Sequence, residues 1–303
     1  MYNAIVVGAR CAGASTAMLL GRKGYKVLLV DRAIFPKEIP HGHFIHRHGP
    51  QRLARWGLLE RITATNCPAV TTMITDFGDL ALTGHDLAVG GVAMGYGPRR
   101  SQLDKVLIDA AVEAGAEVRD GFTVEEFTSD GDCITGIRGR DQRSGQLVHE
   151  TATLTIGTNA RRVERFYGAT DLPNFVRKAH GPGWALVGDA GCHKDPYMAL
   201  GICDALRDAE LLVDAIHLGL NDGGDLAVTL AGYEQERNAA TLEQYRQNLH
   251  LAQFKPMPPA ALALRRKLHG RREEIRAFYL ANQGMVPREH FFNPENLQRL
   301  MGM

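Results

Sequence analysis

The stretch that decides the fold of this 303-residue chain is Ala4-Ile-Val-Val-Gly-Ala-Arg-Cys-Ala-Gly13. Its first four residues form a short, continuously apolar run, which is typical of a strand buried on both faces of a parallel sheet. A glycine-bounded turn follows, and small residues at helical spacing then continue to Gly24. A second apolar run, Lys26–Asp31, completes a βαβ unit. The sequence therefore predicts an α/β fold with a Rossmann-type domain.

The turn of this unit predicts a dinucleotide site. Gly8 permits the tight turn, and Gly13 lets the helix pack close to the strands. The free N–H groups and partial positive charge at the helix start suit a pyrophosphate. Asp31, at the end of the second strand, is placed to accept both hydroxyls of an adenosine ribose. Arg10 occupies the place of the middle glycine of GxGxxG, and we expect its charge to compensate by pairing with the phosphates.

A later segment decides between NAD and FAD, which the first motif leaves open. It reads Trp184-Ala-Leu-Val-Gly-Asp-Ala190, followed by a loop with Pro196 and a helix that opens at Gly201. The two motifs together resemble the FAD-dependent monooxygenases of the para-hydroxybenzoate hydroxylase and geranylgeranyl reductase group. The resemblance implies bound FAD, with the dipole of the later helix stabilising negative charge on the reduced flavin. The motifs and the resemblance assign these residues to FAD: Gly8, Arg10, Cys11, Ala12, Gly13, Asp31, Arg32, Arg100, Val124, Gly188, Asp189, Pro196, Gly201 and Ile202.

Two features of that family are missing. An Asp-Gly motif expected soon after Ile156 is replaced by Gly157-Thr-Asn-Ala-Arg161. The family also inserts a substrate-binding sheet before the Gly-Asp motif, whereas only residues 157–183 lie there in this chain. That segment is too short for several strands of about 5–6 residues with their turns. We therefore expect a reduced cap, with its place taken by the meander Val70–Val92, by the C-terminal helices or by a second subunit, so that a homodimer is one expectation.

The expected organisation follows from these motifs. Residues 1–158 would form the first part of the FAD domain, including a small β meander, and 159–183 a shortened linker. Residues 184–220 would form its second part, and 221–303 a helical C-terminal region. Within the first part, Ser101-Gln-Leu-Asp104 has the form of a capping box and predicts a helix start.

Four histidines crowd one loop, at positions 41, 43, 46 and 48. We expect His43 or His46 to donate protons near the flavin, because imidazole titrates near neutral pH. No metal site is expected, since no nearby carboxylate or thiolate completes a ligand set.

The resemblance implies an FAD-dependent oxidoreductase of the monooxygenase type, with NADH or NADPH as transient electron donor and O2 as oxidant. Its substrate would be a small hydrophobic or aromatic molecule, and a reduced cap would leave hydroxylation poorly coupled. Two alternatives stay open: a reductase of the geranylgeranyl reductase type, and an FAD-binding protein without catalysis.

The composition indicates which kinds of partner and which cellular compartment to expect. Lys and Arg number 35 and Asp and Glu 34, a balance that gives no reason to expect a nucleic-acid partner. Because the sequence contains no apolar run of about 18 residues, we expect no membrane span. Five cysteines without a CxxC pair fit a cytoplasmic location.

Overall fold

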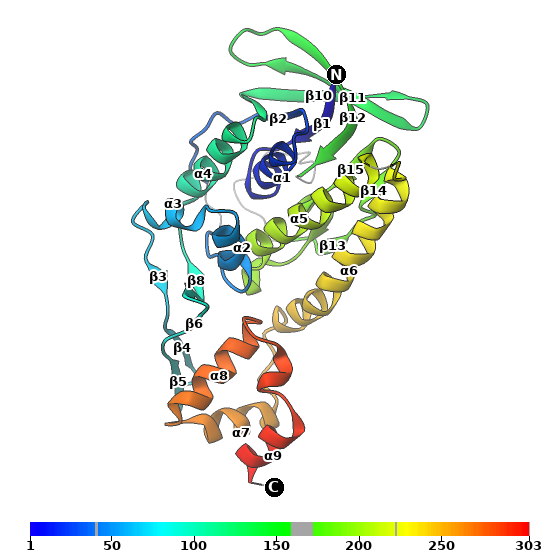
Figure 1. Cartoon of the computed structure of the whole chain (residues 1–303). Coiled ribbons are helices and arrows are strands. Elements are labelled where there is room, and N and C mark those ends of the chain that lie inside the picture. The colour runs from blue at the N-terminus through cyan, green and yellow to red at the C-terminus, as the bar shows by residue number, and fades with distance from the viewer. Residues whose placement is uncertain (40–41, 159–171, 222, 303) are drawn as a thin grey trace. The chain divides into compact units, whose positions relative to one another are not determined.

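The computed structural model describes residues 1–39, 42–158, 172–221 and 223–302, and divides the chain into two compact units (Figure 1). Unit 1 comprises Met1–His43 and Arg99–Ala252. Unit 2 comprises Phe44–Pro98 and Gln253–Met303. Each unit is thus built from two segments that are far apart in the sequence.

Unit 1 is organised around a sheet of eight strands within the described residues. Its parallel part has the order β9-β2-β1-β12-β15, and an antiparallel extension runs from β12 through β11 to β10. In register, Val7 lies opposite Val30 on one side and Gly157 on the other, so three strands end at one edge of the sheet. The strands are β1 (Tyr2–Val7), β2 (Val27–Asp31), β9 (Glu117–Asp120), β10 (Phe122–Asp130), β11 (Cys133–Asp141), β12 (Leu147–Gly157), β14 (His180–Gly181) and β15 (Trp184–Leu186).

In the described part of unit 1, four helices accompany this sheet: α1 packs between α4 and α5, and α6 packs on α5 (Figure 1). Gly21 makes the approach of α1 to α4 possible, because a Cβ there would lie 2.5 Å from the carbonyl oxygen of Ala114. Asp225 caps α6 by accepting the N–H groups of Ala227 and Val228. The helices are α1 (Cys11–Arg22), α4 (Arg100–Glu113), α5 (Gly201–Leu220) and α6 (Leu226–Leu251).

The structure confirms the predicted α/β fold and several of its predicted elements. The strand, helix and strand expected over the first 31 residues are β1, α1 and β2. The small β meander expected within residues 1–158 includes the antiparallel pair β10–β11. The helix expected from Gly201 is α5. These elements form because their apolar residues recur at the spacing of a buried strand or of one helix face.

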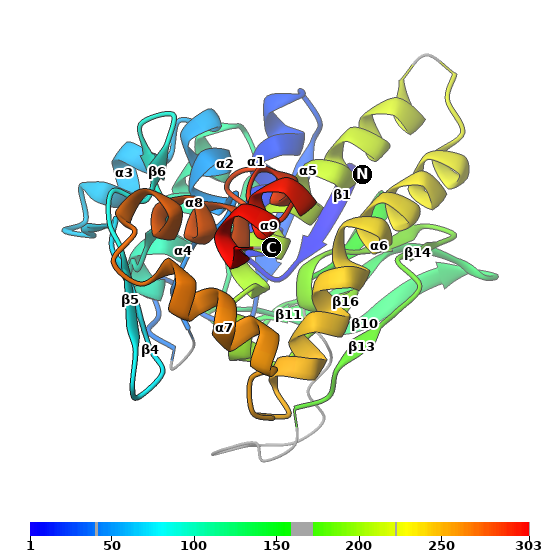
Figure 2. The ribbon, with the colours of Figure 1, turned by 90° about the horizontal axis from the view of Figure 1, so that it is seen from below.

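Unit 2 has a hydrophobic core of its own, in which α8 packs against β5. The ring of Tyr279 fills the space beside Gly84, where a Cβ would lie 2.4 Å from it, and its hydroxyl donates to the carbonyl of Leu82. Figure 2 shows the C-terminal helices in orange and red and the β4–β5 pair in cyan. The elements are α2 (Gly49–Arg55), α3 (Leu59–Thr63), β3 (Ala69–Val70), β4 (Met73–Asp76), β5 (Ala81–Gly84), β6 (Ala88–Val89), β7 (Val92–Ala93), β8 (Gly95–Tyr96), α7 (Pro259–Leu268), α8 (Arg272–Asn282), η3 (Arg288–His290) and α9 (Pro294–Met301).

Four shorter elements in the described part of unit 1 form or flank the second sequence motif. A single 3-10 turn, η1 (Gly188–Ala190), follows β15, and another, η2 (Pro196–Met198), precedes α5. Between them, β16 (Cys192–His193) pairs with β13 (Phe175–Val176). Among the helices in the described part of the chain, none is long and apolar enough to cross a membrane.

Candidate functional site

The β1–α1 turn is tight and leaves the start of α1 open. Gly8 has φ 110°, and its N–H donates to the carbonyl of Val30 at 2.7 Å. A Cβ on Gly13 would lie 1.7 Å from the carbonyl oxygen of Gly8, so only glycine fits there. No described side chain caps α1. The first N–H groups of this helix are therefore available to an anion.

Asp31 is held beside this turn by two backbone groups. Its Oδ2 accepts the N–H of Ala9 at 2.8 Å, and its Oδ1 accepts the N–H of Ala33 at 2.7 Å. Since each carboxylate oxygen can accept more than one hydrogen bond, Asp31 keeps capacity for ligand hydroxyls. The side chain of the neighbouring Arg32 is exposed, and its carbonyl accepts from the amide of Gln142. The ribose role of Asp31 stays a prediction.

Arg10 and Arg100 converge on one carboxylate, that of Asp104 on α4. Asp104 is fully buried. Its Oδ2 accepts from Arg10 Nη1 at 2.8 Å, and its Oδ1 accepts from Arg100 Nη2 at 3.0 Å. Two guanidinium groups on one carboxylate leave an excess positive charge between the first turns of α1 and α4. An anionic ligand is favoured at such a place.

The predicted capping box of this helix is wrong. The N-cap of α4 is Arg99, so Asp104 lies more than a turn inside the helix and cannot reach back to the N-cap. Ser101 instead donates its hydroxyl to Glu38. Asp104 therefore acts through a long-range partner, since Arg10 lies 94 residues away in the β1–α1 turn.

Cys11 lies in the same cluster. Its thiol donates to Asp104 Oδ1 over 3.7 Å. Burial raises the pKa of this thiol from 9.0 to about 12, so the neutral form persists at physiological pH. A neutral thiol adds no negative charge to the positive cluster.

The second sequence motif meets the first at the start of α1. Gly188 has φ +64°, and a Cβ there would lie 2.9 Å from the Cβ of Ala12. A Cβ on Gly201 would in turn lie 3.9 Å from Asp189 Oδ1, which places that carboxylate beside the start of α5. The two motifs, far apart in sequence, therefore lie side by side at the start of α1.

The loop before α5 is held from α6. Asn248 accepts the N–H of Met198 at 3.3 Å and donates to the carbonyl of Asp195 at 2.9 Å. Within this loop Pro196 begins η2, and Ile202 is buried in the first turn of α5. No described side chain caps α5 either, so its first N–H groups also remain open.

Val124 and the two predicted proton donors, His43 and His46, have surroundings that differ from those of the motif residues. Val124 lies at a bulge of β10 and packs against a core cluster that includes Ile5 and Phe122. His43 is exposed at the end of the first segment of unit 1. His46 is buried in unit 2, with its Nδ1 3.1 Å from Gln283 Oε1 and its ring stacked on Phe44. The roles assigned to these residues stay predictions. His41 and Arg161 lie outside the described residues.

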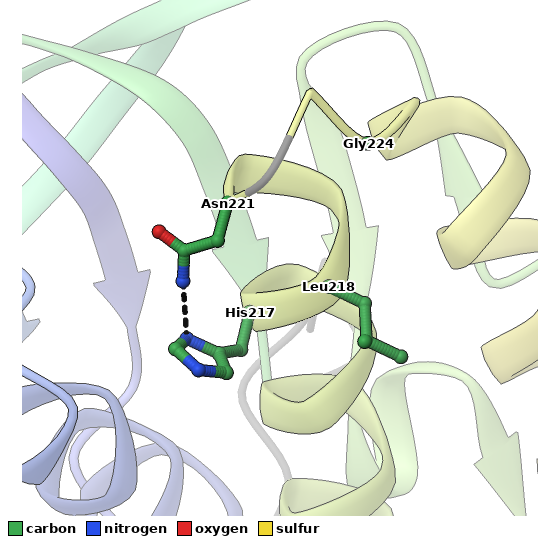
Figure 3. Close-up of a pocket in the computed structure, with 4 residues that line it drawn as sticks. All are labelled: His217, Leu218, Asn221 and Gly224. Carbon is green, nitrogen blue, oxygen red and sulfur yellow. Dashed lines mark hydrogen bonds between the residues drawn. The ribbon is translucent and has the colours of Figure 1, made fainter.

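A pocket of about 410 Å³ lies at the opposite end of α5 (Figure 3). It is lined by His217, Leu218, Asn221 and Gly224. The imidazole Nδ1 of His217 lies 2.7 Å from the amide nitrogen of Asn221 and 3.0 Å from the hydroxyl of Tyr25. Because a helix of 20 residues is about 30 Å long, this pocket is separate from the motifs at the start of α5.

Comparison with known proteins identifies the family to which the chain belongs. Residues 1–162 match the family described as FAD binding domain, and the chain belongs to that family. Protein FixC of Salmonella typhi is 28% identical over 175 residues, which cover 54% of this chain and 39% of FixC. A putative polyketide hydroxylase of Streptomyces halstedii is 27% identical over 172 residues, 52% of this chain and 30% of that protein. The matches thus span about two fifths or less of these relatives.

A solved structure shares the fold over nearly the whole chain. The myxobacterial chondrochloren halogenase CndH, described as a variant of FAD-dependent halogenases, superposes with a TM-score of 0.71. The match covers 99% of this chain and 97% of that one, at 14% sequence identity. The family match and the hydroxylase relative together confirm the resemblance to FAD-dependent monooxygenases, and the family match and the solved structure confirm the fold class.

Proposed function

We propose that the chain is an FAD-dependent oxidoreductase of the monooxygenase type that takes electrons from NADH or NADPH and delivers them to O2. The observation that carries this proposal is the meeting of the two motifs, in which Gly188 lies against Ala12 at the uncapped start of α1. FAD, when bound, supplies the redox chemistry, while the protein supplies binding and orientation. The name of the Streptomyces hydroxylase supports the monooxygenase type.

The residues present fit an FAD molecule. A Cβ at Gly13 would lie 1.7 Å from the carbonyl oxygen of Gly8, so the glycine keeps the β1–α1 turn tight beside the uncapped start of α1, where a pyrophosphate would bind. In this proposal, the N–H groups of α1 and the guanidinium of Arg100 bind the pyrophosphate, and Asp31 accepts the ribose hydroxyls. Asp189 and the start of α5 orient the flavin end. His43 and His46 remain proposed proton donors.

The substrate is proposed to be a small hydrophobic or aromatic molecule, with hydroxylation poorly coupled to electron transfer. The support is the length of segment 157–183, which leaves little chain to shield the reacting atoms from water. A homodimer and a cytoplasmic location belong to the same proposal.

The test is a visible absorption spectrum of the protein reconstituted with FAD, before and after NADPH or NADH is added in air. We expect flavin bands that bleach and then recover, with nearly one H2O2 formed per nicotinamide oxidised. Stoichiometric hydroxylated product would overturn poor coupling. Anaerobic turnover of an alkene would favour a saturating reductase, and FAD binding without nicotinamide oxidation a non-catalytic protein. A protein that stays colourless with added FAD would refute the cofactor assignment.

A further inference from the structure

The side chain of Arg10 occupies the position at which the dinucleotide motif has its middle glycine. Its backbone has φ −97°, so the turn does not demand glycine here for conformational reasons. What matters is where the long side chain goes. Its Nη1 lies 2.8 Å from Asp104 Oδ2, and its Cζ lies 5.5 Å from the centre of the Phe35 ring. The guanidinium is therefore held by an ion pair and an aromatic face.

Asp104 also holds Arg100. The Nε and Nη2 atoms of Arg100 both donate to Asp104 Oδ1, at 3.3 and 3.0 Å. The carboxylate is fully buried, and the Arg10 and Arg100 side chains are 22% and 9% exposed, so solvent screens both ion pairs only weakly. One carboxylate thus ties the residue that precedes α1 to the first residue of α4.

We propose that Asp104 is a positioning residue for the dinucleotide pyrophosphate. Its ion pair holds the side chain of Arg10 away from the β1–α1 turn. It also fixes the orientation of Arg100, because one edge of that guanidinium donates to Asp104. The backbone N–H groups of the turn then stay open although a large side chain replaces glycine. In this arrangement the guanidinium of Arg10 pairs with Asp104 and binds no phosphate. The inference rests on the proposed FAD site and adds to it a residue that binds no ligand itself.

For Asp104→Asn, the change in charge and the loss of the positioning contact predict opposite changes in FAD affinity. The substitution removes one negative charge from a site with two guanidinium groups, so electrostatics alone would tighten the binding of an anion. The positioning role predicts weaker binding, because the released side chain of Arg10 can enter the turn. We expect the dissociation constant of FAD to rise at least tenfold.

Two further variants make the role of Arg10 measurable. Arg10→Met alone should weaken FAD binding less than threefold, since it removes a nearby positive charge but no phosphate contact. Adding Arg10→Met to Asp104→Asn should recover part of the lost affinity, because the released cation is gone. If Asp104 only stabilised the fold, replacing Arg10 as well would not restore FAD affinity. Asp109→Asn is the matched control on the same helix, since Asp109 pairs only with the exposed Lys105 among the described residues, and it should leave the affinity unchanged.

The experiment is a titration of each full-length variant with FAD, followed by flavin fluorescence, with thermal melts to compare folding. Wild-type protein that binds no FAD would overturn the proposed function itself. If wild type binds FAD, equal or tighter binding by Asp104→Asn would overturn the positioning role and leave the function standing. A tenfold loss in Arg10→Met would do the same by showing that Arg10 is a phosphate ligand. That last measurement remains decisive if Asp104→Asn does not fold.

Discussion

Gly13 is the position at which the smallest change has the largest expected effect. A Cβ there would lie 1.7 Å from the carbonyl oxygen of Gly8, and backbone cannot rotate away as a side chain can. We expect Gly13→Ala to abolish FAD binding and to lower the free energy of unfolding by about 3 kcal/mol or more. Gly232→Ala is the control, because that glycine lies within α6 with no atom within 4 Å of a Cβ. It should stabilise the protein by about 0.5–1 kcal/mol in urea denaturation.

The thiol of Cys11 gives a second test at this scale. Its pKa of about 12 in the folded protein exceeds the ordinary 9.0, so folding favours the protonated form. The resulting stabilisation is complete below pH 9 and is lost as the pH rises towards 12. At pH 8 we expect iodoacetamide to modify the exposed Cys133 and to spare Cys11, as read by mass spectrometry of peptides. Cys133→Ser provides the control, and rapid alkylation of Cys11 in it would contradict the buried, neutral thiol.

Individual residues differ in how far the sequence alone reveals them. Gly8 and Gly13 follow from a local rule about turns, and the structure gives each the conformation or close contact that the rule requires. The role of Asp104 does not follow from such a rule. Its partner Arg10 is 94 residues away in the sequence, and only the packing of α1 on α4 brings the two together. A short-range pattern therefore suggested a helix cap where the structure has a long-range ion pair.

At the scale of elements, a buried ionic network joins α5 to α6 and to the loop before α5. Arg207 lies at its centre, with Nη1 2.7 Å from Asp204 and Nη2 2.7 Å from Asp208. The same Nη2 donates to the hydroxyl of Thr241 on α6. Lys194, from the loop, lies 2.6 Å from Asp204. The apolar spacing of α5 predicted the helix, but not this network, because its polar partners come from three separate segments.

Removing the central cation should therefore loosen the start of α5. We expect Arg207→Met to cost about 3–5 kcal/mol, because it leaves two buried carboxylates with one cation. Burial already raises the pKa of Asp208, while Arg207 lowers it, so the variant should raise it further. Protonation then relieves the unpaired charge, and the loss of stability should be smaller at pH 5 than at pH 8. Denaturant melts at both pH values test this.

The matched control is Lys105→Met on α4. Its partner Asp109 is 2.7 Å away, but both side chains are exposed, so the change should stay within about 0.5 kcal/mol. An equal loss of stability in both variants, or a loss in Arg207→Met that does not depend on pH, would contradict the network as described.

At the scale of the whole molecule, the chain crosses between its two units three times, after His43, after Pro98 and after Ala252. Apolar periodicity predicted α1, α4 and α5 and a helical C-terminal region. It could not show that residues 44–98 and 253–303 share one core, because that depends on contacts such as Tyr279 with Gly84, about 200 residues apart in sequence. The boundaries expected at residues 158, 183 and 220 concern the FAD domain and its linker, and they stay predictions.

Every residue proposed to bind FAD belongs to unit 1, so we expect FAD to stabilise unit 1 more than unit 2. The chain has two tryptophans, Trp184 in unit 1 and Trp56 in unit 2. Trp56→Phe and Trp184→Phe therefore each leave one fluorescent reporter, of unit 1 and unit 2 respectively. Free FAD at about 100 times its dissociation constant should stabilise the unit that binds it by about 2.7 kcal/mol. We expect the urea midpoint reported by Trp184 to rise with FAD more than that reported by Trp56. Comparing each variant with and without FAD cancels the effect of the substitution, and a larger shift at Trp56 would contradict the assignment of the site to unit 1.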